Sequence, residues 1–118
     1  MEKLKVIFHV NEPEKWDVAL GNVTNLLRDV SPDMIEVRVL ANGPSIVAFS
    51  DEAKLSTMAA LSEAGVKFLA CRNSLNKLGC SGAVCITEQN LPPYIGVVPA
   101  GITELIKRQS EGFAYVKP

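Results

Sequence analysis

The nine residues Val66-Lys67-Phe68-Leu69-Ala70-Cys71-Arg72-Asn73-Ser74 join an apolar run to a polar triplet. A short, mostly apolar run is typical of a strand buried in a parallel sheet, and we interpret residues 66–71 as such a strand. The polar residues begin a short helix over residues 73–78, which Gly79 ends. Cys71 therefore lies at the carboxyl end of a strand and the amino end of a helix, where backbone N–H groups and the helix dipole stabilise a thiolate.

Segments with strand-like and helix-like hydrophobic spacing alternate along the whole chain. The pattern predicts five strands, at residues 4–10, 34–41, 66–71, 94–98 and 113–116. It predicts helices between Asn11 and Ser31, over residues 50–64 and 73–78, and between Gly101 and Gly112, with residues 80–93 as loop. Such alternation implies right-handed crossovers and helices on both faces of a parallel sheet. We therefore predict an α/β fold with a five-stranded, mostly parallel sheet, a flavodoxin-like three-layer sandwich with strand order 2-1-3-4-5.

Length and composition indicate one globular domain, residues 1–118, because this length suffices for a single hydrophobic core. The formal net charge is −1 and the basic residues are dispersed, which argues against a nucleic-acid-binding surface. No apolar run approaches the roughly 20 residues of a membrane span, and the N-terminal residues lack the pattern of a signal peptide. Three cysteines, an odd number, do not suit a secreted disulfide framework. We expect a cytoplasmic protein that binds neither membranes nor nucleic acid.

Reactive groups gather at the carboxyl ends of the strands in open parallel sheets. We expect Cys71 to be the catalytic residue there. The residues placed to support it are His9, Arg72 and Asn73. Five further residues follow strands at the same edge and are candidates for a pocket: Asn11, Asn42, Gly43, Pro99 and Gly101.

The side chains of Cys71, His9 and Arg72 each have two interpretations. Cys71 is either a buried core cysteine, because a free thiol packs as a small hydrophobe, or a nucleophile. His9, the only histidine, either stabilises the thiolate and relays its proton or makes only a structural hydrogen bond. In the order 2-1-3-4-5, strands one and three are neighbours, which would bring His9 to the same edge as Cys71. Arg72 either binds an anion and lowers the thiol pKa or points to solvent.

The other two cysteines, Cys80 and Cys85, are separated by four residues. This spacing fits neither a CxxC redox pair nor a zinc site, so we expect no metal. Either cysteine is a candidate resolving residue for a disulfide with Cys71, or it packs within a loop. Neither GxGxxG nor GxxxxGK[ST] occurs, so we expect no flavin, dinucleotide or other cofactor.

Several segments resemble members of the DsrE/DsrF-like family. They are KVIFHV at residues 5–10, Trp16 with ALGNVTNLL at 19–27, GVKFLACRNSL at 65–75 and VVPAGITELIKRQSEGFAYVKP at 97–118. The resemblance implies a parallel sheet of the YchN-like kind, assembled as a homo-trimer or homo-hexamer, and a persulfide-carrying cysteine after the central strand, where Cys71 falls. The family members that act in sulfur relays usually have alanines and then arginine-glycine after this cysteine. This chain has Arg72-Asn73-Ser74-Leu75 instead. The chain looks closer to the stand-alone branch of the family.

Three functions follow as hypotheses. The first is a sulfur carrier, in which Cys71 accepts a sulfane sulfur from a donor protein and passes it to an acceptor thiol. Such a carrier would have a sulfurtransferase-like activity. The second is a thiol redox sensor with Cys71 resolved by Cys80 or Cys85. The third is an oligomeric binding module with an incidental cysteine.

Two groups of apolar residues complete the expectations. In the last helix we expect Ile102, Leu105 and Ile106 to face inward. The loop residues Ile46, Val47 and Phe49 are expected to be buried against another subunit.

Overall fold

The computed structural model describes residues 3–118 and contains the five strands and four helices that the sequence pattern predicts. The strands of the main sheet are β1 (Leu4–Val10), β2 (Ile35–Ala41), β3 (Lys67–Cys71), β6 (Ile95–Val98) and β7 (Ala114–Val116). The helices are α1 (Trp16–Asp29), α2 (Glu52–Glu63), α3 (Arg72–Leu78) and α4 (Gly101–Ser110). A small antiparallel hairpin, β4 (Cys80–Ser81) and β5 (Val84–Cys85), lies within the segment expected to be loop.

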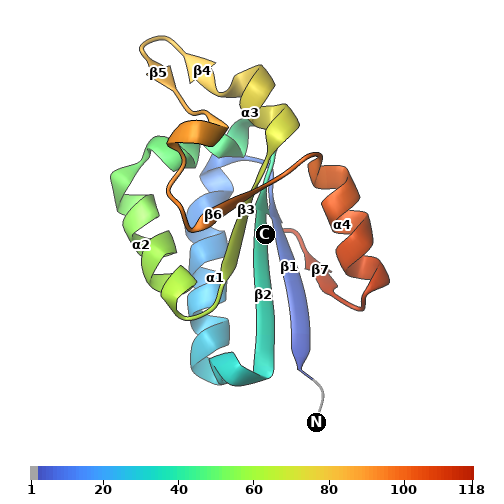
Figure 1. Ribbon diagram of the computed structural model, residues 1–118. Helices are drawn as coiled ribbons and strands as arrows, with labels where there is room; N and C mark the ends of the chain where they lie inside the picture. The colour runs from blue at the N-terminus through green and yellow to red at the C-terminus, as the bar shows by residue number, and fades with distance from the viewer. Residues whose placement is uncertain (1–2) are drawn as a thin grey trace.

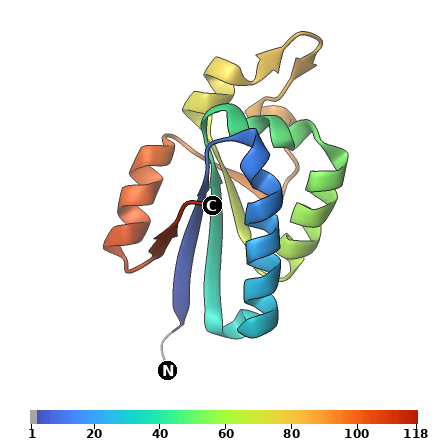
Figure 2. The same cartoon turned by 180° about the vertical axis from the view of Figure 1, so that it is seen from behind.

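All neighbouring strands of the main sheet are parallel, as predicted, but the predicted strand order is wrong. The observed order is β6-β3-β2-β1-β7. The connections through α1 and α2 lie on one face of the sheet, so each right-handed crossover steps in the same direction, from β1 to β2 to β3 (Figure 1). The connection through α4 lies on the opposite face, so it steps back across the sheet and places β7 beside β1 (Figure 2).

Each face of the sheet has its own hydrophobic core. On the α1 and α2 side, Val6, Phe8 and Val10 of β1 pack in one cluster with Trp16 and Met58. On the α4 side, a smaller cluster contains Ile7, Leu40, Leu105 and Phe113. The alternation of side chains along each strand separates the two clusters. His9 and Tyr115 therefore lie on the α4 side of their strands, like Ile7.

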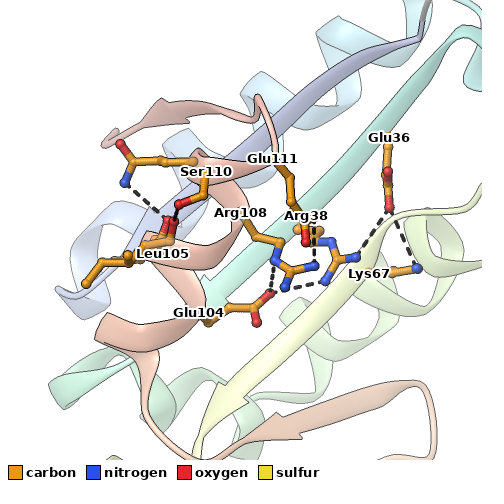
Figure 3. Close-up of polar contacts among 10 residues, drawn as sticks. Glu36, Arg38, Lys67, Glu104, Leu105, Arg108, Ser110 and Glu111 are labelled. Atoms are coloured by element: carbon orange, nitrogen blue, oxygen red, sulfur yellow. Dashed lines mark hydrogen bonds and ion pairs between the residues drawn. The ribbon is translucent and has the colours of Figure 1, made fainter.

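The expectation that Ile102 and Ile106 face inward is wrong, since they are 65% and 59% exposed. Leu105 does face inward. The reason is a charged cluster between α4 and the sheet, which Figure 3 shows. Arg38 of β2 donates to Glu104 of α4 at 3.1 Å.

The charged cluster has further members around this ion pair. Arg108 contacts the same carboxylate oxygen of Glu104 at 3.4 Å, and the Arg38 guanidinium lies 5.3 Å from the centre of the Phe113 ring. Glu36, Lys67 and Glu111 complete the cluster at its exposed edge. Because Glu104 and Arg108 turn toward the sheet to meet Arg38, the isoleucines of α4 are left on the outer surface.

The segment after β2 forms a 3-10 helix, Gly43–Ser50. Ile46 and Phe49 of this segment are buried in the chain's own core, so the expectation that they contact another subunit is wrong. Val47 is 51% exposed. The buried Trp16 indole Nε1–H donates to the Ser45 carbonyl at 2.8 Å and fixes this segment against α1. Within residues 3–118, no helix is both long enough and apolar enough to cross a membrane.

Candidate functional site

Cys71 ends β3 on the same face of the sheet as α4. It is a free cysteine and is 5% exposed. Its sulfur accepts a hydrogen bond from the backbone N–H of Gly101, the first residue of α4, over 3.3 Å. The sulfur is therefore held between the start of α3, which follows it in the chain, and the start of α4.

Ser74 links this region to the turn after β2. Its hydroxyl oxygen accepts a hydrogen bond from the Gly43 N–H at 2.7 Å. Burial raises the pKa of the Cys71 thiol, but hydrogen bonds from the hydroxyl and backbone N–H of Ser74 and from the backbone N–H groups of Gly101 and Asn73 outweigh it. The pKa of Cys71 therefore lies below the ordinary thiol value.

Two glycines allow the turn after β2 and the start of α4 to pack closely in this region. Gly43 has a φ of +59°, and a Cβ there would collide with the Asn11 side chain. At Gly101, a Cβ would lie 3.2 Å from the Asn42 amide nitrogen and 3.3 Å from a Leu40 methyl group. Side chains at these positions would push the turn after β2 and the start of α4 away from the thiol.

His9 does not lie next to Cys71, because β2 separates β1 from β3. The expectation that strands one and three are neighbours is wrong for this reason. His9 Nε2 contacts the side-chain amide oxygen Oδ1 of Asn42 at 2.9 Å, and Nδ1 contacts the Tyr115 hydroxyl at 2.6 Å. Since an amide oxygen can only accept, Nε2 carries the proton in the neutral ring and Nδ1 accepts from the tyrosine. Asn42 and Gly101 thus connect His9 to the thiol indirectly.

The position of His9 has a topological reason. The strand order reverses between β1 and β7, the place where parallel α/β sheets form ligand crevices at their carboxyl edge. Here the hydrogen bond between His9 and Tyr115 joins the two strands at that place.

Arg72 points away from the thiol, although it is the next residue. Its guanidinium forms two hydrogen bonds with the Glu88 carboxylate, each 2.9 Å long. This contact lowers the pKa of Glu88 and raises that of Arg72. Asn73 contributes its backbone N–H, as given above.

Cys80 and Cys85 form a disulfide with each other. The candidate bridge from either of them to Cys71 is therefore not the arrangement in the structure. The two residues are directly opposite across the β4–β5 hairpin, with their Cα atoms 4.0 Å apart, so each is the nearest partner of the other. The hairpin projects beyond the carboxyl edge of the main sheet, above α3 (Figure 1).

The five expected pocket residues do not form one cavity. Gly101 contacts the thiol and packs against Asn42, and Gly43 packs against Asn11. Pro99 instead lines a separate small cavity of about 120 Å³ with Thr103, Glu104 and Lys107 of α4. A larger cavity of about 780 Å³ lies toward the amino ends of the strands, far along the sheet from Cys71. It is an apolar groove between α1 and the β1–β7 edge, and its lining includes Leu4, Val6, Leu26, Ile35, Ala114 and Val116.

Sequence reasoning did not single out Ser74 or Tyr115. A signal for Ser74 was present, because it stands three residues after Cys71, the N-cap residue of α3. A polar side chain three residues after an N-cap is well placed to reach back to it. Nothing comparable marks Tyr115, whose contact depends on β7 lying beside β1.

Comparison with known proteins agrees with this architecture. The model of the DsrE/DsrF-like family matches residues 23–118. The solved structure of MTH1491 from Methanobacterium thermoautotrophicum, a protein of unknown function, superposes with a TM-score of 0.83 at 27% identity. That match covers 98% of this chain and 100% of the other. No curated protein matches the chain significantly. On the family match and this full-length structural likeness, the chain belongs to the DsrE/DsrF-like family.

Proposed function

We propose that this protein is a sulfur carrier with a sulfurtransferase-like mechanism, in which Cys71 holds a persulfide. The observation that carries the proposal is the position of the buried Cys71 sulfur between the starts of α3 and α4, where it accepts a hydrogen bond from the Gly101 N–H and where donors from Ser74 and Asn73 also lower its pKa. These donors favour the thiolate, which is the form of cysteine that attacks sulfur. Membership of the DsrE/DsrF-like family supports the same chemistry.

The reaction has two balanced steps. The Cys71 thiolate attacks the terminal sulfur of a donor persulfide, the donor's S–S bond breaks, and the donor leaves as a thiolate. Cys71 then carries the sulfur as Cys–S–SH. An acceptor thiolate attacks that terminal sulfur and expels Cys71 as a thiolate. The same hydrogen bonds favour both steps, because Cys71 is the nucleophile in the first step and the leaving group in the second.

The supporting residues act through position. Asn42 and Gly101 hold the start of α4 against the sulfur, and His9 orients Asn42. Arg72 is engaged by Glu88, so it reaches an anionic partner only when that ion pair opens. We place the reaction in the cytoplasm, where thiols are kept reduced. A persulfide on a side chain needs neither a metal nor a cofactor.

Mass spectrometry after incubation with a cysteine persulfide donor tests the proposal. We expect a gain of one sulfur atom on the peptide that contains Cys71, removable by a thiol acceptor. The Cys71→Ser variant should show no gain, and the Cys80→Ser/Cys85→Ser double variant should retain it. Absence of the added sulfur from Cys71 in the native chain would contradict the proposal.

We also propose that the protein works as a homo-oligomer, a trimer or hexamer as the family resemblance implies. The exposed Ile102 and Ile106 of α4 and the apolar groove between α1 and the β1–β7 edge support self-association. Light scattering coupled to gel filtration at micromolar concentration tests it. A monomeric mass across that range would argue against assembly.

A further inference from the structure

The β4–β5 hairpin holds a second pair of sulfur atoms, distinct from the Cys71 site. Every residue from Cys80 to Cys85 is exposed. The disulfide joining the two cysteines is therefore open to attack by a thiolate from solution.

This disulfide does not hold the main fold together. It joins two positions that the hairpin already pairs, with only four residues between them. It connects no element of the main sheet to another, and none of the residues it encloses is buried. The sheet and its two cores can therefore persist when the bond is open. A bond with this placement suits reversible opening better than structural reinforcement.

The segment that leaves the hairpin is attached to α3 at two points. The Ile86 N–H donates to the Gly79 carbonyl at 2.8 Å, and the Ile86 side chain is buried. Two residues further on, Glu88 forms its paired hydrogen bonds with Arg72. Asn90 also donates to the Cys85 carbonyl at 2.8 Å and caps the turn that carries Glu88. The disulfide therefore closes the hairpin at Cys85, three residues before Glu88, whose carboxylate holds the guanidinium of Arg72.

We propose that Cys80–Cys85 is a redox-active site that exchanges with a dithiol reductant, and that its reduction frees Arg72 from Glu88 and increases the reactivity of Cys71. The proposal goes beyond sulfur transfer and does not require it, because it concerns the state of the hairpin and the reactivity of a free thiol.

The exchange is balanced in atoms and electrons. One thiolate of the reductant attacks a sulfur of the disulfide, forms a mixed disulfide and expels the other cysteine as a thiolate. The second thiol of the reductant, as its thiolate, attacks the mixed disulfide and releases the remaining cysteine. Two electrons pass from the dithiol to the hairpin, the dithiol becomes a disulfide, and its two protons end on Cys80 and Cys85.

The effect on Cys71 is electrostatic. In the closed hairpin, Glu88 neutralises the Arg72 guanidinium. With the disulfide open, the segment from Val84 to Glu88 loses the covalent constraint at Cys85, and only the non-covalent contacts of Ile86 and Asn90 then position the carboxylate. An unpaired guanidinium one residue from the thiol then favours the thiolate. An exposed disulfide in a cytoplasmic protein is typically transient or redox-sensing, which fits this behaviour.

The first experiment uses dithiothreitol as the dithiol on the native full chain. After equilibration with dithiothreitol at neutral pH, free thiols are blocked and located by peptide mass spectrometry. We expect Cys80 and Cys85 to be labelled together while Trp16 fluorescence remains that of the folded chain. Labelling of these residues only after a denaturant is added would overturn the proposal.

The second experiment measures the rate at which iodoacetamide modifies Cys71, resolved by peptide, in the oxidised and reduced chains. We expect at least a threefold higher rate in the reduced chain, and the same higher rate in Cys80→Ser/Cys85→Ser. Glu88→Gln should reproduce the increase with the disulfide intact. Glu63→Gln, the same charge change at the exposed end of α2, is the matched control and should leave the rate unchanged. Equal rates in the oxidised and reduced chains, or no effect of Glu88→Gln, would overturn the proposal. Neither result bears on whether Cys71 accepts sulfur from a donor.

Discussion

The backbone N–H of Gly43 donates a hydrogen bond to the hydroxyl oxygen of Ser74 over 2.7 Å. The same hydroxyl is the largest of the groups that lower the pKa of the Cys71 thiol. The turn after β2 thus influences a thiol at the end of β3 through one hydroxyl group.

Ser74→Ala removes this hydroxyl and should raise the pKa of Cys71. A hydrogen bond to a charged group contributes about 1.5–3 kcal/mol, so we expect alkylation of Cys71 at pH 7 to slow by about tenfold. Ser74→Thr keeps the hydroxyl and should retain most of the rate. The measurement is the pH dependence of iodoacetamide modification of the Cys71 peptide. An alanine variant with the wild-type pH profile would show that the hydroxyl does not stabilise the thiolate.

The lowered pKa of Cys71 also predicts how folding stability changes with pH. Between the folded and unfolded pKa values, the unfolded chain binds more protons at this residue, so stability increases with pH. The contribution is fully present above the unfolded thiol pKa and is lost as the pH falls through the folded one. The difference in unfolding free energy between wild type and Cys71→Ser, measured by urea denaturation, should therefore grow from pH 6 to pH 10. A difference independent of pH would contradict this.

Glu104→Gln tests the charged cluster under α4. The substitution leaves Arg38 and Arg108, whose side chains are each 16% exposed, without their shared carboxylate. Removing one partner of a buried ion pair is strongly destabilising, and we expect a loss of about 3 kcal/mol in chemical denaturation. Glu36→Gln is the control, because Glu36 is 32% exposed and contacts Arg38 at 3.4 Å from the outer side. A similar, small loss of unfolding free energy in both variants would show that burial of Glu104 does not increase the contribution of its ion pairs to stability.

His9 is the only histidine, so its ring nitrogens can be observed without ambiguity. In the neutral ring we expect the proton on Nε2, because the side-chain amide oxygen Oδ1 of Asn42 can only accept. Tyr115→Phe removes the donor to Nδ1 and should allow the other tautomer to be populated. Nitrogen-15 chemical shifts distinguish the two forms. A proton on Nδ1 in the wild-type chain would mean that the tyrosine is the acceptor.

The strands and helices were predictable because each buries a regular apolar pattern. The strand order was not, because it depends on which face each connecting helix covers. The alternation of strands and helices along the chain does not indicate which face of the sheet α4 covers. The outward-facing side chains of Ile102 and Ile106 show a second limit of prediction from sequence spacing. Helical spacing predicts that they face inward, but the need of Arg38 for a counter-charge turns Glu104 toward the sheet instead.

The candidate site was predictable in part. Cys71 and the glycine and asparagine residues near it follow from the rule that parallel strands place their carboxyl ends at one edge. The partners of these residues did not follow, because they depend on strand order and on contacts between distant segments. Ser74 meets Gly43, His9 meets Tyr115, and Arg72 meets Glu88 in ways that chain position alone does not indicate.

The pairing of β7 with β1 has a consequence for biosynthesis. Residues 114–116 dock against residues 6–8, so a strand is joined by one that is synthesised much later. Contacts between residues so distant in sequence form late, and while the chain is still being synthesised one edge of β1 has no partner. Until residue 115 has left the ribosome, His9 also lacks the Tyr115 hydroxyl. The nascent chain can therefore assemble the environment of Cys71 before the ring of His9 is fixed in place.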